Sequence, residues 1–146
     1  IDSGLEPGQT YTYKVKARDK SPNHNETDWS AERSATTAQA TVVFVQSIAV
    51  TIDKTGKSYK ARSTVTLSEP IDGAEVSGDW YFNGQLIQEG AKASTAGGIA
   101  VLVSPKKKAK SGDTFEFKLK DVGNLPLGYV YDPQSNLTQS GSATVP

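Results

Sequence analysis

The chain has 146 residues, enough for one ordinary domain, or for one small domain and part of another. Lys and Arg together number 16, as do Asp and Glu, and this balance argues against a general electrostatic attraction to nucleic acid or to an anionic membrane. There is no Cys, which excludes disulfides, thiolate nucleophiles and thiolate metal sites.

Neither a membrane span nor a signal peptide is expected within the chain. No window has the long apolar run of a transmembrane helix, and none has a basic segment followed by an apolar one. Ile1 stands where a complete reading frame has Met. We therefore expect a processed or excised product, with any export signal upstream of it.

The first strand is predicted from the alternation in "YTYKVKA", residues 11–17. A polar loop, residues 18–28, separates it from a second predicted strand, "WSAERSATT", residues 29–37. The two strands are expected to form a hairpin with one half-buried face. The side chains expected on that face are those of Tyr11, Tyr13, Val15 and Ala17.

From about residue 44 onward, period-two alternation recurs between Gly, Pro, Asn and Asp. The Asn83-Gly84 pair predicts a tight hairpin turn. In "DWYFNG", the pleat is expected to send Trp80 and Phe82 into the core and Tyr81 to the opposite side, where its ring would be exposed. The region predicts about seven strands in roughly a hundred residues, which is typical of a β-sandwich. The predicted fold class is all-β.

The first segment resembles the C-terminal end of a fibronectin type III domain. The matching residues are Leu5, Pro7 and Tyr11 in "GLEPGQTYTYKVKARD", followed by Trp29 and Ser30 in "WSAERSATT". The resemblance implies a tyrosine corner, in which the phenol OH bonds back to the turn backbone, and implies that the hairpin is formed by the last two strands, F and G. Residues 1–38 would then be a truncated domain, whose hairpin needs an opposing sheet because two strands alone are marginally stable.

The second segment resembles an immunoglobulin-like module appended to secreted bacterial hydrolases. The resemblance lies in "AVTIDKTGKSYKARSTVTL", "GAEVSGDW", "GIAVLVSP" and "FEFKLKDVGNLPLGYVYDPQSN". It covers residues 46–146, and residues 39–45 are expected to be a linker. Some members have a Cys pair in the central strands, which this chain lacks. The implied function is a secreted or cell-surface, non-catalytic accessory module beside a glycoside hydrolase or subtilisin-like peptidase domain, with the other domains of the parent protein as its partners.

No residue pattern predicts catalysis or a cofactor. His24, the one histidine, lies between Asn residues in the polar loop, where a solvated role is expected. The acidic pairs Glu26 with Asp28 and Asp19 with Glu32 belong to the same hairpin and suggest no cleft. No phosphate-binding or dinucleotide motif occurs. We expect no enzyme and no bound cofactor.

Three binding alternatives remain open at this stage. The turns that begin at Asp53 and Asp132 contain enough oxygen groups for calcium, although ordinary turns use the same residues, and no metal site is assigned. The lysine run 106–110 suggests either an anionic polymer or a solvated turn. A polysaccharide-binding module would use exposed rings, for which the candidates are Tyr81, Tyr129 and Tyr131. A further alternative is a cell-surface adhesion domain with a protein partner.

Overall fold

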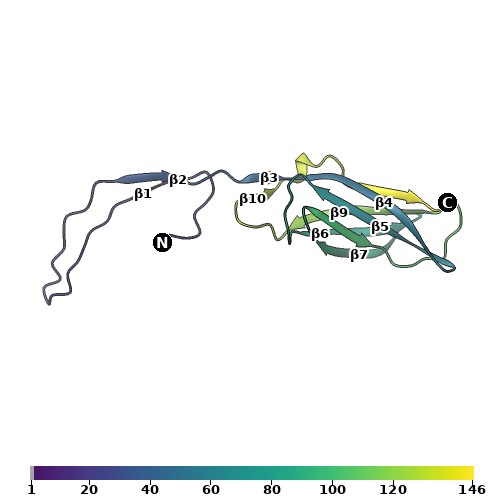
Figure 1. Ribbon diagram of the computed structural model, residues 1–146, viewed down its shortest axis with the longest axis horizontal. Helices are drawn as coiled ribbons and strands as arrows, with labels where there is room; N and C mark the ends of the chain where they lie inside the picture. Colours follow the sequence, from purple (N-terminus) through teal and green to yellow (C-terminus); the bar gives the residue numbers. More distant parts are fainter. Residues whose placement is uncertain (1) are drawn as a thin grey trace. The chain divides into compact units, whose positions relative to one another are not determined.

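The computed structural model describes residues 2–146 and divides the chain into two compact units, one ending at Ala40 and one beginning at Thr41. The described residues form strands and one short 3₁₀ turn, and no α-helix occurs among them (Figure 1). The all-β prediction is confirmed. Each unit is described by itself below.

Unit 1 is a hairpin of β1 (Thr10–Tyr13) and β2 (Arg33–Thr36), paired antiparallel. Both strands are shorter than predicted. Cross-strand hydroxyl pairs stabilise the pairing, with 2.7 Å between Oγ1 of Thr10 and Oγ1 of Thr36. Beyond the regular strands, the two arms of the hairpin are held together by scattered bonds, such as that from the Thr27 amide to the Ala17 carbonyl (3.0 Å).

The face of the hairpin predicted to be half-buried is largely exposed. Tyr11 is half-buried, whereas Val15 and Trp29 are 69% and 59% exposed. Regular strand pairing ends at Tyr13, so the pleat governs Tyr11 and Tyr13 but does not extend to Val15 and Ala17, and burial also needs a second layer. Among residues 2–40, no such layer packs on this face.

Unit 2 contains two main sheets. The three-stranded sheet has the order β4-β5-β8 and the four-stranded sheet has the order β11-β9-β6-β7. Both sheets are antiparallel throughout. The strands of the two sheets are β4 (Val45–Thr55), β5 (Ser58–Leu67), β6 (Glu75–Phe82), β7 (Gln85–Ser94), β8 (Ile99–Val103), β9 (Thr114–Gly123) and β11 (Ser140–Thr144).

The core of unit 2 is formed by inward-facing side chains from both sheets. Trp80 is fully buried and its ring lies 5.2 Å from that of Phe117 on the neighbouring strand. From the opposite sheet, the fully buried Ala61 and Val65 belong to the same core cluster. Trp80 therefore lies where the sequence predicts it, and Phe82 is partly buried against the same core.

The Asn83-Gly84 turn of unit 2 follows the expected chemistry. Asn83 and Gly84 both have positive φ, 49° and 77°, as a tight hairpin turn of the mirror-image type requires. In this turn the side-chain Oδ1 of Asn83 accepts from the Thr114 amide (2.8 Å), and the side-chain Nδ2 of Asn83 donates to Asp113 Oδ1 (3.0 Å). The turn is thus bonded to the start of β9.

A small parallel pair begins unit 2. β3 (Thr41–Val43) lies beside β10 (Tyr129–Tyr131), and the Thr41 amide donates to the Gly128 carbonyl at 2.8 Å. The 3₁₀ turn η1 (Pro133–Ser135) follows β10. Of the residues expected to form the linker, 39–45, the structure places 41–43 in β3 and Val45 at the start of β4.

Candidate functional site

The tyrosines predicted to contact a glycan lie in two separate places. Tyr81 is near the end of β6, opposite Glu116, whereas β10 follows the other end of β9, where Gly123 pairs with Glu75. Six residues of strand separate Tyr81 from that end, a distance of about 20 Å at about 3.3 Å per residue. The three rings therefore do not form one platform.

Tyr81 is half-buried rather than fully exposed. Lys118 of the adjacent strand places its Nζ 4.6 Å from the centroid of the Tyr81 ring. A cation stacked in this way occupies the ring face that a sugar would use.

The hydroxyl of Tyr131 belongs to a hydrogen-bond network within unit 2. Its hydroxyl accepts a hydrogen bond from Asn136 Nδ2 (2.7 Å), and Asn136 Oδ1 accepts from the Val45 amide (2.7 Å). Burial raises the pKa of Tyr131 above its ordinary value, so the phenol stays neutral in this network. The network ties β10 and η1 to the first residue of β4. Tyr129, on the same side of β10, is the more exposed of the two.

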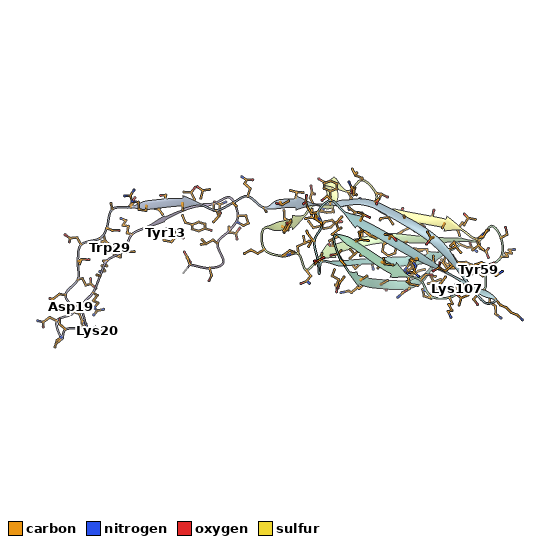
Figure 2. The ribbon with its side chains drawn as sticks, in the orientation of Figure 1. Tyr13, Asp19, Lys20, Trp29, Tyr59 and Lys107 are labelled. Carbon is orange, nitrogen blue, oxygen red and sulfur yellow. The ribbon has the colours of Figure 1, made fainter. Side chains whose placement is uncertain are left out.

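The polar loop of unit 1 is organised by Asp19. Its two carboxylate oxygens accept from the amide and hydroxyl of Ser21 and from the amide and side chain of Asn25, at 2.7 to 3.1 Å. These bonds, chiefly those from the Ser21 and Asn25 side chains, lower the pKa of Asp19. His24 is exposed and has a φ of 48°. Figure 2 shows Asp19 and Lys20 at the far end of the hairpin.

Two of the other acidic candidates in unit 1, Glu26 and Glu32, form ion pairs across the hairpin, whereas no ion pair of Asp28 is found among residues 2–40. Glu26 contacts Lys16 and Arg18, and Glu32 lies 2.9 Å from Lys14. These contacts stabilise the pairing of the two arms. They do not bring two carboxylates together across a cleft, which is the arrangement needed for glycoside hydrolysis.

The two turns considered for calcium use their carboxylates otherwise. Asp53 Oδ2 lies 3.3 Å from Arg62 Nη2. Asp132 caps η1, with Oδ1 accepting from the Gln134 amide (3.0 Å) and Oδ2 from the Ser135 hydroxyl (2.6 Å). Among residues 2–146, no three His, Asp or Glu side chains gather closely enough to hold a metal ion.

The lysine run lies beside other lysines that are distant in the sequence. The backbones of Tyr59 and Lys107 exchange two hydrogen bonds of 2.8 Å, which brings the run next to the β4–β5 turn (Figure 2). Lys54 Nζ lies 5.8 Å from the Tyr59 ring centroid. No ion-pair partner within the described chain is found for any of the lysines at this end of unit 2. We call these residues the basic end: Lys54, Lys57, Lys60, Lys106, Lys107 and Lys108.

Residues near the basic end also include one carboxylate with an altered pKa. Asp113 accepts from the Lys110 amide (2.9 Å) and from the Asn83 side chain (3.0 Å). These bonds, the first more strongly, lower the pKa of Asp113. The sequence pattern singles out only the run 106–110, because Lys54, Lys57 and Lys60 come near this run only through strand pairing.

In the part of the chain that the structure describes, no helix has the length and apolarity to cross a membrane. Comparison of the chain with known protein families, with curated proteins and with solved structures finds no match.

Proposed function

We propose that this chain is a non-catalytic spacer or accessory piece of a secreted, multi-modular bacterial protein, where it holds a hydrolase domain at a distance from an insoluble polymer or presents it to that polymer. Unit 2 would be an immunoglobulin-like sandwich. Unit 1 would contribute the last two strands of a fibronectin type III domain. The hydrolase partner is inferred from the sequence resemblance.

The observation that carries this proposal is the position of Trp80 in the strand order of unit 2. If β4, β5, β6, β7, β8, β9 and β11 are equated with strands A, B, C, C′, E, F and G, one sheet is A-B-E and the other is G-F-C-C′. A fully buried tryptophan on strand C is a hallmark of immunoglobulin domains, and Trp80 lies on β6 at that place.

Unit 1 supports the fibronectin type III proposal through Tyr11. Its hydroxyl accepts a hydrogen bond of 2.9 Å from the Glu6 amide, five residues upstream, which is the contact that defines a tyrosine corner. Thr37 closes the same turn, with its hydroxyl 2.6 Å from the Glu6 carbonyl. In such a domain, the exposed side chains of Tyr13, Val15 and Trp29 would pack on an opposing sheet.

A spacer role also agrees with the anchoring of the residues between the units. The Gly8 amide bonds the Ala38 carbonyl (3.0 Å), and the Thr41 amide bonds Gly128 (2.8 Å). Only Gln39 and Ala40 lie between these two anchored residues in the sequence. A spacer is expected to have a short connection of this kind between its modules and not a long flexible linker.

The test replaces residues 1–146 in the parent protein with a Gly/Ser segment of the same length. The two forms are compared on soluble and insoluble preparations of one polymer. We expect equal rates on the soluble form and a lower rate on the insoluble form for the flexible replacement. Equal rates on both preparations would refute a spacer role, and lost activity on the soluble preparation would assign the chain a part in catalysis.

The basic end supports a second candidate function, binding of an acidic polysaccharide. Six lysines without an ion-pair partner among the described residues gather at this end of unit 2, on a chain of zero net charge. Lys54 shares a face with Tyr59, whereas Lys60 lies on the opposite face of the ribbon, across from Asp53. The triple change of Lys54, Lys57 and Lys60 to Gln should abolish retardation in gels containing polygalacturonate. The control changes Lys14, Lys16 and Lys92, each of which is ion-paired, to Gln as well. Equal loss in both variants would show a net-charge effect instead of a binding surface.

A further inference from the structure

β8 is an edge strand, and part of its outer backbone is unpaired among residues 2–146. It bonds to β5 on one side and ends the three-stranded sheet. The Leu67 amide donates to Gly98 (2.8 Å) and the Ser104 amide to Ala61 (2.9 Å) in the same register. Because bonded and non-bonded pairs alternate in an antiparallel ladder, Ala100 and Leu102 bond to β5. The N–H and C=O groups of Val101 and Val103 therefore point to the open edge.

The open part of this edge is limited to a short stretch. Ile99 already exchanges two bonds with Ala96, at 2.9 and 3.1 Å, and Pro105 has no N–H to donate. Within residues 2–146, no other segment bonds to the outer backbone groups of Val101 and Val103. Four backbone groups are thus available, which is the number that one symmetric pairing would satisfy.

The exposed side chains of β8 are all aliphatic. Ile99, Val101 and Val103 are 45%, 42% and 40% exposed and form one row on the outer face of the sheet. Edge strands in soluble proteins are usually protected by charges, proline or bulges. Between Ile99 and Val103, β8 has none of these protections.

Opposite charges flank the two ends of β8. At its start, Asp72 Oδ1 accepts from the Gly97 amide at 2.6 Å. After its end come Lys106 and Lys108, both exposed. None of these three charged side chains has an ion-pair partner among the described residues. If a second β8 strand lies antiparallel along the first, the lysines after the end of each strand lie near Asp72 at the start of the other. The charges at the two ends are then complementary.

We propose that two copies of this chain associate through antiparallel pairing of their β8 strands about a two-fold axis at Leu102. Val101 of each copy then bonds to Val103 of the other, which satisfies all four open backbone groups. The two aliphatic rows join into one apolar surface. Ala96 already covers the outer side of Ile99, so the pairing ends there and the segment after Val103 of one copy leaves the edge near the turn 96–98 of the other, where Lys106 and Lys108 approach Asp72.

The pairing is weak, because one short strand buries less surface than the roughly 1,200 Å² that stable complexes need. The dimer therefore forms at a high local concentration, as on a crowded surface. It is also salt-dependent, since its flanking ion pairs are exposed and are screened within about 10 Å at 0.1 M salt.

The test is sedimentation equilibrium of the full chain from micromolar to millimolar concentration, combined with amide exchange. We expect a concentration-dependent dimer in which the Val101 and Val103 amides become protected while that of Ile99 does not change. Val101→Lys should raise the dissociation constant about tenfold or more, because the new cation lies in the apolar pairing. The control Leu86→Lys changes a side chain of similar exposure, 50%, on β7 of the other sheet and should have no effect.

Two further arms identify the surface and the orientation. Val15→Lys alters the exposed face of unit 1, so loss of the dimer in this variant but not in Val101→Lys would overturn the proposal. Asp72→Lys should weaken self-association, and mixing it with a Lys106→Glu, Lys108→Glu variant should restore pairing. A chain that remains monomeric at millimolar concentration, or an unrestored charge swap, would also overturn it.

Discussion

Gly78 lies in β6 at a position where the neighbouring strand leaves no space for a side chain. A Cβ at this residue would lie 2.4 Å from Cζ of Phe117 and 2.4 Å from the Lys118 carbonyl oxygen. Carbon atoms pack best at about 3.5 to 4.0 Å, so the added methyl would overlap the ring by about 1 Å. Phe117 is fully buried and cannot turn into solvent, and the second contact is with backbone. The core must therefore shift to accept Gly78→Ala.

Overpacking of this kind costs about 1 to 3 kcal/mol, and the contact distances place Gly78→Ala at the upper end. The new methyl group also restricts the unfolded chain, which raises the free energy of unfolding by about 0.4 to 1 kcal/mol. The net loss in the free energy of unfolding is about 2 kcal/mol, which lowers Tm by about 8 to 16 °C in a unit of this size. Gly123→Ala is the matched control, because its Cβ would meet only Asp121 Oδ2, at 3.9 Å.

The assay is urea unfolding followed by tryptophan fluorescence. Every variant also has Trp29→Phe, so that the signal comes from the buried Trp80 of unit 2 alone. We expect Gly78→Ala to lower the unfolding midpoint and Gly123→Ala to leave it unchanged or slightly raised. If both glycine variants lose the same stability, or if Gly78→Ala loses none, the packing of Phe117 over β6 is wrong.

Three further predictions address the polar contacts. Tyr11→Phe removes the acceptor for the Glu6 amide and should lower the stability of unit 1 by about 1 kcal/mol. Amide exchange should become faster in β1 and β2 and stay unchanged in unit 2. Faster exchange in both units would contradict a local role of Tyr11. Asp79→Ala removes the acceptor of a 2.8 Å hydrogen bond from the Gly90 amide. Urea unfolding should show a loss of about 1 to 3 kcal/mol in the stability of unit 2. An unchanged unfolding midpoint would show that water replaces the carboxylate. The folded-state pKa of Asp113 lies below its ordinary value of 3.8, so its carboxylate stabilises the fold above that pH and the effect is lost as the pH falls through the folded pKa. The difference in Tm between wild type and Asp113→Asn should therefore be present at neutral pH and disappear in acid, and a difference that persists in acid would refute the assignment.

The sequence pattern predicts the elements of unit 2 well, because alternation alone determines which side chains share a face. The pattern "DWYF" predicts that Trp80 and Phe82 face the core, and the Asn83-Gly84 dipeptide predicts its turn, as the structure has them. Alternation does not reveal which strands are neighbours. The Lys118 side chain stacked on Tyr81 depends on the register of β6 with β9, which no local pattern specifies.

In unit 1, by contrast, the sequence pattern predicts burial that the structure does not show. Its alternation predicts a buried face, but burial of Val15 depends on a second sheet and not on the hairpin itself. The basic end was missed for a similar reason. Lys60 and Lys107 are far apart in the chain and come close only because Tyr59 pairs with Lys107. In both cases the missing information is which distant segments lie next to a given strand.

Amide hydrogen exchange across the full chain tests the central claim most directly, that unit 2 is a sandwich closed around Trp80 while unit 1 is a hairpin without a second layer. The account predicts that amides of the inner strands β5, β6 and β9 exchange only through global unfolding, while those of β1 and β2 exchange much faster. Equal protection of the two units, or rapid exchange in β6, would contradict it.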